Sequence, residues 1–413
     1  MADFVTHGEL LDRVAAADFE HPPALVANAH ITGLGVARAL AEHDVPVIAV
    51  DRTGDGAAPP SEAVDFAGAV TYPLDDLDGF RDDVEAIAEA AGTDLVVFGC
   101  MDEWVHAFAN ADPEGVRLPF ADQDVIDAVL DKTSLYRIAE DLDVPYPETR
   151  WLGESETTVE TAIDDLGLPL VVKPALKREF EEAIGTNVIE VETESEFRDV
   201  VAMADEAGIE ILAQKKVPIA RGEDASLASY VPPSGVDDAL GVVGNAKVRN
   251  PPGYGTSCVV GRAHRPEIEE MALSVLAETG YHGVSEAEFV YDAERETYVL
   301  LDVNTRPWKW IGLPVAAGAN LPMAAYADAT EARYDPGDSH DATWVYLPDY
   351  LDLLASDDGF RDVLARGDWR AFLSGDFETR RDLTAAVYRP SDPEPAVRIL
   401  RNELSGREYY CSC

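Results

Sequence analysis

The sequence predicts an α/β and α+β protein in which a doubly wound parallel sheet precedes a second unit built on antiparallel strands. Up to residue 125, short apolar runs alternate with helical segments, which is typical of strands and their crossover helices. Over residues 126–330, strand-like runs come in pairs joined by short polar turns. Residues 331–413 carry acidic helical patterns and no catalytic motif, so we expect a C-terminal helical cap.

The first unit begins with the apolar run ALVANA, a predicted strand, followed by a helix through GLGVARALAEH and a strand VPVIAVD that ends at Asp51. The helix FRDDVEAIAEAAG, the strand DLVVFGC and the helix DEWVHAFAN complete it. Gly33, Gly35 and Asp51 imitate a dinucleotide-binding fingerprint, but Arg38 stands at the third glycine position. We therefore rank a nicotinamide site below a structural βα turn or a small-molecule site at the strand ends.

After Phe120 the pattern predicts helices through DVIDAVLDKTSLYRIAEDL, which contain Lys132 and end at the Val-Pro and Tyr-Pro breaks. The apolar run GLPLVVKPAL then predicts a buried strand ending at Lys173. A lysine in that position is costly to desolvate unless an anion meets it. The following turn, with Lys177, Arg178 and Gly185, is a candidate lid over a phosphate.

The next strands carry further charged candidates. Gln214, Lys215 and Val217 lie at the end of the strand ILAQKK, and Glu223 and Asp224 occupy the polar turn that follows.

Beyond that turn, Lys247 and Arg249 alternate to one face of a strand just before the loop NPPGYG, a placement suited to gripping an anionic reacting group. The alternative is a pair of solvated side chains. Because only seven of the 32 basic residues are lysine, we favour the site.

The runs SEAEFVYD and TYVLLDVNTR predict a β-hairpin. If residues 293–297 close the turn, facing residues have numbers that add up to 590, so Glu288 opposes Asp302 and Glu286 opposes Asn304. Alternation then puts all four side chains on one face of the pair.

Two carboxylates placed directly opposite each other destabilise a sheet unless a cation lies between them. Mg²⁺ is the economical candidate because it prefers oxygen ligands and takes one or two carboxylates plus substrate phosphates. Arg306 follows on the same face, where we expect it to reach a phosphate oxygen. The alternative is a solvated acidic sheet face.

The amino-acid composition says more about the environment of the protein than about its binding partners. The 413 residues include 79 acidic and 32 basic side chains, for a net charge of −47, which repels nucleic acid and anionic membranes. High acid with scarce lysine indicates a halophilic protein of a salt-rich cytoplasm. The apolar runs are too short to span a bilayer, no secretory leader is apparent, and the four cysteines (Cys100, Cys258, Cys411 and Cys413) lack the spacing of a zinc site. We expect a cytoplasmic protein.

Together these motifs resemble the ATP-grasp superfamily, and within it the carboxylate–amine ligases similar to D-aspartate ligase and the carbamoyl phosphate synthetase large subunit. The resemblance runs from about Ala24 to about Tyr326. It rests on Lys132, on VVKP with Lys173, on residues 214–217, on KVRNPPGYGT, and on Glu288 with the segment DVNTR. Two positions depart from the family pattern: Lys215 stands where an acid is common, and Asp302 replaces a glutamate.

The resemblance implies a pre-ATP-grasp domain over residues 1–125 and an ATP-grasp domain over 126–330 with a lid at about 168–215. ATP and Mg²⁺ (or Mn²⁺) are the implied cofactors. The implied nucleotide-binding residues are Lys132, Lys173, Gln214, Lys215, Val217, Glu223 and Asp224; the implied metal ligands are Glu288, Asp302 and Asn304; Lys247, Arg249 and Arg306 would stabilise charge in catalysis.

The implied reaction joins a small-molecule carboxylate and an amine through an acyl phosphate, with no nucleic-acid or membrane partner and with a homodimer left open. Phosphoryl transfer of this kind is mainly positioning and charge neutralisation. Three alternatives remain: a bicarbonate-using carboxylase or carbamoyl-type enzyme, an NAD-dependent oxidoreductase, and a non-catalytic nucleotide-binding protein.

Overall fold

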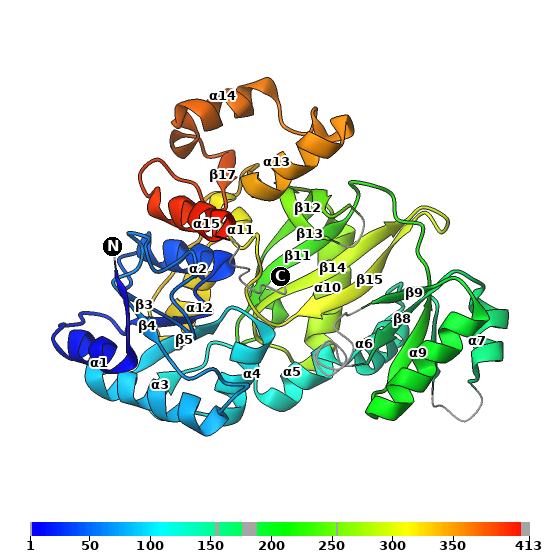
Figure 1. Ribbon diagram of the computed structural model, residues 1–413, viewed down its shortest axis with the longest axis horizontal. Coiled ribbons are helices and arrows are strands. Elements are labelled where there is room, and N and C mark those ends of the chain that lie inside the picture. Colours follow the sequence, from blue (N-terminus) through cyan, green and yellow to red (C-terminus); the bar gives the residue numbers. More distant parts are fainter. Residues whose placement is uncertain (1, 153–156, 176–187, 253–254, 406–413) are drawn as a thin grey trace.

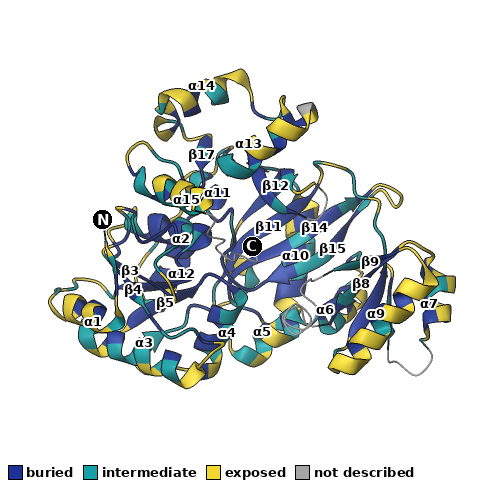
Figure 2. Ribbon diagram, in the orientation of Figure 1, coloured by how far each residue is buried: buried dark blue, intermediate teal, exposed yellow. Residues whose placement is uncertain are grey.

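The computed structural model describes residues 2–152, 157–175, 188–252 and 255–405, whose strands form three sheets (Figure 1). Figure 2 shows the strands largely buried and the outer faces of the helices exposed. The predicted combination of α/β and α+β architecture is confirmed. None of the helices in these ranges is both long and apolar enough to cross a bilayer.

The N-terminal sheet is entirely parallel, with the strand order β1-β4-β3-β2-β5-β6. Alternate residues of β2 pack on opposite sides: Ala24 and Val26 contact the layer that holds α2, and Leu25 and Ala27 contact the layer of α1, α3 and α4. Helices therefore cover both faces, as a doubly wound sheet requires. Its elements are β1 (Phe4–Val5), α1 (His7–Ala15), β2 (Ala24–Ala27), α2 (Ile31–Ala41), β3 (Val47–Asp51), β4 (Phe66–Ala69), α3 (Leu77–Ala91), β5 (Leu95–Gly99), α4 (Asp102–Ala111) and β6 (Val116–Arg117).

The residues that imitate a dinucleotide fingerprint pack the first βα turn. A Cβ on Gly33 would lie 2.4 Å from the Asn28 carbonyl oxygen, and one on Gly35 would lie 2.6 Å from Cγ2 of Ile311. Asp51 accepts hydrogen bonds from the backbone N–H groups of Ala29 (3.0 Å) and Arg52 (2.7 Å). These contacts favour the structural reading of the turn over a nicotinamide site.

A small antiparallel sheet of order β7-β10-β8-β9 follows two connecting helices. It has its own hydrophobic core, which includes Val159, Val172 and Phe197. The expected lid, residues 168–215, falls within this unit, but Lys177, Arg178 and Gly185 lie outside the described residues. The elements are α5 (Gln123–Leu130), α6 (Lys132–Asp141), β7 (Thr149–Leu152), α7 (Val159–Leu166), β8 (Leu170–Pro174), β9 (Ile189–Val191), α9 (Glu194–Ala207) and β10 (Ile211–Lys215).

The largest sheet has the order β15-β14-β11-β12-β13-β16-β17 and is antiparallel except for its last pair. Its core is continuous with that of the N-terminal sheet, because each of the two large hydrophobic clusters contains side chains from both sheets. Its elements are β11 (Ala225–Val231), η1 (Val236–Asp238), β12 (Leu240–Asn250), β13 (Thr256–Arg262), α10 (Pro266–Thr279), β14 (Gly283–Asp292), β15 (Thr297–Asn304), α11 (Gly312–Ala316) and α12 (Leu321–Ala329).

The C-terminal segment contains the expected helices and also extends this sheet with two short strands, β16 (Thr343–Val345) and β17 (Leu383–Ala385). Its helical elements are α13 (Leu347–Ser356), η2 (Asp358–Phe360), α14 (Arg366–Ser374), η3 (Asp376–Thr379) and α15 (Glu394–Leu404). Strands of three residues are too short to leave a readable alternation in the sequence.

Candidate active site

The predicted hairpin is β14 and β15, and its facing pairs are confirmed: Glu288 opposes Asp302, and Glu286 opposes Asn304. The turn is shorter than expected, because the pairing of Asp292 with Thr297 leaves four residues in it rather than five. A register shift after Glu288, where Phe289 pairs with Leu300, restores the pairing. Such a bulge places one extra residue in one strand, here Leu301 of β15, which has no partner across the pair.

The four polar side chains share one face of the pair, as predicted. Ala287, Phe289 and Val303 point to the other face and are buried in the core. The Asn304 amide Nδ2 donates to Glu286 Oε2 (3.2 Å) and to Glu288 Oε1 (3.0 Å), which ties the two strands together.

Basic side chains meet the opposed carboxylates. Lys132 Nζ lies 2.8 Å from Asp302 Oδ1, and its residue is only 5% exposed. It is held there because it begins α6, whose N-cap residue Asp131 accepts from the Thr133 N–H, and because its own N–H donates to the Ala175 carbonyl just after β8. A buried lysine of this kind needs the negative charge beside it.

Glu286 is the most buried carboxylate of the group. Burial, together with the nearby negative charge of Glu288, raises the pKa of Glu286 to about 8. Within the described ranges, no three acidic, histidine or cysteine side chains converge into an all-protein metal cage. The donors that remain, two facing carboxylates and the Asn304 amide, are the incomplete oxygen set that Mg²⁺ uses when phosphates supply its other ligands.

A cleft of about 340 Å³ lies over this face, between the four-stranded and seven-stranded sheets. It brings together most of the predicted site residues from seven separate segments of the chain. Those that line it are Lys132, Lys173, Gln214, Lys215, Val217, Asp224, Arg249, Glu286, Glu288, Asp302, Asn304 and Arg306.

The end of β10 forms one wall of the cleft. Gln214 is buried and donates from Nε2 to Thr149 Oγ1 (3.0 Å). Lys215 is more exposed and lies 3.4 Å from both Glu148 and Glu294, whose negative charges raise its pKa. Lys215 stands where the family pattern has an acid, and glutamates of neighbouring loops neutralise its charge.

Arg249 and Asp224 form an ion pair on the opposite wall, with Arg249 Nε 2.8 Å from Asp224 Oδ2. A second contact of Arg249, at 3.7 Å, reaches Glu288 Oε2. Burial raises the pKa of Asp224, and its Oδ1 is buried without a hydrogen-bond partner among the described residues. This oxygen is an acceptor that a ligand can use.

Two predicted site residues lie outside the cleft. Lys247 is exposed, lies against Gly261 and lines a smaller neighbouring cavity of about 240 Å³. Arg249 lines that cavity as well, so of the two basic residues only Arg249 also reaches the cleft, and register shifts flank Val248 between them. Glu223 is also exposed, with Arg265 3.8 Å away, whereas its neighbour Asp224 turns inward.

The guanidinium of Arg306, expected to point at a phosphate, forms an ion pair with Asp102 at the start of α4. Its Nε lies 2.5 Å from Asp102 Oδ1 and its Nη2 lies 3.2 Å from Oδ2, while Nη1 donates to the Pro307 carbonyl. Sequence reasoning missed Asp102. The available signal was its position directly after the parallel strand β5, at the carboxyl edge where doubly wound sheets place functional groups.

The segment after Arg306 closes the cleft with aromatic side chains. Trp308 and Trp310 are both buried and line it, with ring centroids 5.1 Å apart. Lys309 between them donates to Asp349 (2.8 Å) and Thr256 (2.9 Å). The Trp308 indole Nε1 is buried and makes no hydrogen bond to any described residue, so it is an unused donor beside the cleft.

No protein-family model matches the chain. A curated relative, the carbamoyl phosphate synthase large chain, C-terminal section, of Methanopyrus kandleri, is 24% identical over 227 residues. That match covers 51% of this chain but only 38% of the relative's length.

Solved structures show the fold. Biotin carboxylase from Campylobacter jejuni, in a β,γ-ATP complex, superposes with a TM-score of 0.62 at 14% identity, covering 78% of this chain and 75% of that one. N5-carboxyaminoimidazole synthetase from Staphylococcus aureus, complexed with ADP, gives 0.61 at 14% identity, with 84% and 87% covered.

A third neighbour is the biotin carboxylase domain of the Hydrogenobacter thermophilus 2-oxoglutarate carboxylase, solved with MgADP and bicarbonate. It gives a TM-score of 0.60 at 15% identity, with 76% and 71% covered. The chain therefore shares the fold of these carboxylases and synthetases, in agreement with the ATP-grasp resemblance of its motifs.

Proposed function

We propose that the chain is an ATP-dependent ligase that joins a carboxylate to an amine and releases ADP and phosphate. One observation carries the proposal. The opposed pair Glu288 and Asp302, its counter-cation Lys132, and Arg249 converge on one cleft from separate elements of an ATP-grasp fold. A cleft that combines fixed cations with a partly filled oxygen donor set suits a metal-bound polyphosphate.

The nucleotide would lie between the two antiparallel sheets. Lys132 and Lys173 approach from α6 and the end of β8, where their charges offset those of the phosphates. The segment from Gln214 to Val217 would meet the adenine through its backbone. Asp224, rather than the exposed Glu223, would accept a ribose hydroxyl through its unpartnered Oδ1.

Glu288, Asp302 and Asn304 would hold Mg²⁺ or Mn²⁺. When bound, the ion neutralises charge on the β- and γ-phosphates. Asp302 already attracts a cation, because the Lys132 ammonium lies 2.8 Å away. Glu286 lies two residues before Glu288 on the same strand and would be largely protonated near neutral pH. It accepts a hydrogen bond from the Asn304 amide and so holds that side chain in place.

The reaction would start when a substrate carboxylate oxygen attacks the γ-phosphorus and the bond to the ADP oxygen breaks. The amine then attacks the acyl phosphate, loses a proton and displaces phosphate. Arg249 would stabilise negative charge in both steps from its position beside Glu288. Arg306, fixed by Asp102, would face the acceptor end of the cleft, where the Trp308 indole N–H is an available donor. Lys247 has no part in the proposed machinery because it lies outside the cleft.

A bicarbonate-using reaction is the second candidate, because the neighbours include carboxylases and one of them was solved with bicarbonate. The same cleft would serve, with bicarbonate in the place of the organic carboxylate.

A phosphate-release assay distinguishes the two reactions. With Mg²⁺ and ATP in high salt, amino acids and small dicarboxylates are supplied singly and in pairs, and bicarbonate is supplied with and without each amine. The ligase proposal expects ADP and phosphate only when a carboxylate and an amine are both present. Turnover that depends on bicarbonate favours the second candidate. If no pair of substrates causes ATP-dependent phosphate release and the protein does not bind ATP, both candidate reactions are refuted.

A further inference from the structure

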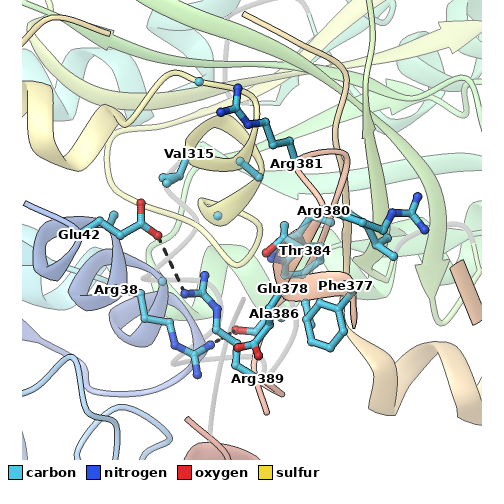
Figure 3. A pocket seen from close by; sticks show the side chains of 18 of the residues that line it. Arg38, Glu42, Val315, Phe377, Glu378, Arg380, Arg381, Thr384, Ala386 and Arg389 are labelled. Atoms are coloured by element: carbon cyan, nitrogen blue, oxygen red, sulfur yellow. Dashed lines mark hydrogen bonds and ion pairs between the residues drawn. The ribbon is translucent and has the colours of Figure 1, made fainter. Parts of the chain in front are cut away.

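A second cavity, of about 570 Å³, lies where the C-terminal segment covers α2. Its walls come from α2, from α11 and the residues around it, and from residues 377–391 (Figure 3). This volume is in the range of small-molecule sites. Among the residues that the structure describes, only Lys309 lines both this cavity and the cleft described above.

Arginine side chains dominate the charged lining. Arg38 comes from α2, and Arg380, Arg381 and Arg389 come from the C-terminal segment. The chain as a whole has a net charge of −47, so a cluster of four arginines opposes its overall electrostatic character. Such a cluster concentrates anions only where its charges are not already neutralised, which depends on the partners of each side chain.

Two of the four arginines are neutralised by aspartates that do not line the cavity. Arg38 is 5% exposed, and its Nη2 lies 2.8 Å from Asp392 Oδ2. Arg380 lies 2.9 Å from Asp368 and 2.6 Å from Asp382. These pairs fix the cavity walls.

The other two arginines retain binding capacity. The carboxylate nearest to Arg389 is that of Glu42, at 3.9 Å, the outer limit of an ion pair. Arg381 is exposed and makes no hydrogen bond or ion pair with any residue that the structure describes. Both side chains can therefore turn to a ligand without breaking a strong contact.

Arg389 also lies close to Arg38, as Figure 3 shows on the α2 side of the cavity. Burial, together with the positive charge of Arg389, lowers the pKa of Arg38 to about 10. Two neighbouring guanidinium groups repel each other, and an anion between them would relieve the repulsion.

The acidic lining residues are Glu42, Asp338 and Glu378. Glu378 is occupied, since it accepts hydrogen bonds from the Ser391 backbone N–H and hydroxyl. Asp338 is exposed. His340 adds a ring nitrogen that could bind a ligand, because its Nε2 is buried without a hydrogen-bond partner within the described ranges. The lining thus offers more free donors than free acceptors.

We propose that this cavity binds a small molecule carrying at least two carboxylate or phosphate groups. One group would take the place of Glu42 beside Arg389 and Arg38, and another would reach Arg381. Guanidinium groups suit this role because their planar N–H donors match both kinds of anion. The inference goes beyond the proposed ligase reaction and does not depend on it, because no residue of the ATP-grasp motifs lines the cavity and Lys309 alone is shared with the cleft.

Isothermal titration calorimetry with citrate and with inorganic pyrophosphate, each of which carries at least two anionic groups, tests this site. Divalent metal is omitted because citrate chelates it, and potassium chloride keeps the ionic strength constant. The variants are Arg381→Gln and Arg389→Gln, and the matched control is Arg333→Gln, whose side chain is 84% exposed and outside the cavity. Arg381→Gln removes no described contact, so it should fold, which a thermal unfolding scan checks.

We expect at least one of the two anions to bind the wild-type protein. Its Kd should rise by about 10-fold or more in each cavity variant, the loss typical of one charge-assisted hydrogen bond, and stay unchanged in Arg333→Gln. Preference for citrate assigns the site to carboxylates, and preference for pyrophosphate assigns it to phosphoryl groups. Failure of both anions to bind, or equal binding by all the variants, would overturn the proposal.

Discussion

Removing either partner of the Arg306–Asp102 pair should destabilise the protein by roughly 3 kcal/mol, because a buried charge would be left without its counter-charge. The Arg306 side chain is 5% exposed and makes two contacts to the carboxylate, at 2.5 Å and 3.2 Å. Two charge-assisted hydrogen bonds at about 1.5 kcal/mol each give that figure. Because the Asp102 side chain is 25% exposed, the expected loss of stability lies at the low end of the range for buried pairs.

The assay is a double-mutant cycle of Asp102→Ala, Arg306→Met and the double variant, followed by guanidinium unfolding. We expect the double variant to lose little more than either single one, with a coupling of about 2–3 kcal/mol. The exposed pair of Arg81 and Asp78, at 2.8 Å, serves as a control that should couple by less than about 1 kcal/mol. If the losses of unfolding free energy in the two single variants add up to the loss in the double variant, the Arg306–Asp102 pair does not stabilise the protein as argued.

Three further predictions concern the cleft and the first βα turn. Asp302→Asn should lower ATP turnover roughly 100-fold or more, and unchanged phosphate release would remove the hairpin from the mechanism. The pKa of Glu286 is about 8 in the folded state, above its unfolded value, so the native state binds more protons and the unfolding free energy should fall as pH rises from about 4.5 to about 8. Metal-free urea titrations check this, and Glu286→Gln should flatten the slope. Gly35→Ala should cost about 1–3 kcal/mol because its Cβ would meet Ile311, whereas Gly8→Ala, with no atom within 4 Å, should be neutral or slightly stabilising; thermal unfolding that ranks them in the other order contradicts the packing argument.

The sequence predicts the architecture and the facing pairs well because both depend on short-range patterns. Alternation along the runs around Glu288 and Asp302 is enough to place their side chains on one face. The predicted turn length was wrong by one residue, and a bulge that no periodicity reveals compensated for it. The same kind of irregularity lies at Val248, between Arg249, which lines the cleft, and Lys247, which does not.

Contacts between distant segments were beyond sequence reasoning. Arg306 and Asp102 are 204 residues apart, and nothing in the local pattern of either predicts the other. The cavity between α2 and residues 377–391 depends in the same way on how the C-terminal segment crosses the N-terminal domain. Where a side chain's partner comes from another unit, its role follows from tertiary packing rather than from its own motif.

The distribution of hydrophobic cores determines how the chain should come apart. Both large clusters mix side chains of the N-terminal and seven-stranded sheets, whereas the four-stranded sheet has a cluster to itself. Heating or denaturant should therefore melt the first two as one cooperative block, and the small sheet could open on its own at lower cost. A fragment cut near residue 125 would expose half of a shared interior, so the N-terminal segment is a layer of a larger folding unit rather than a transplantable module.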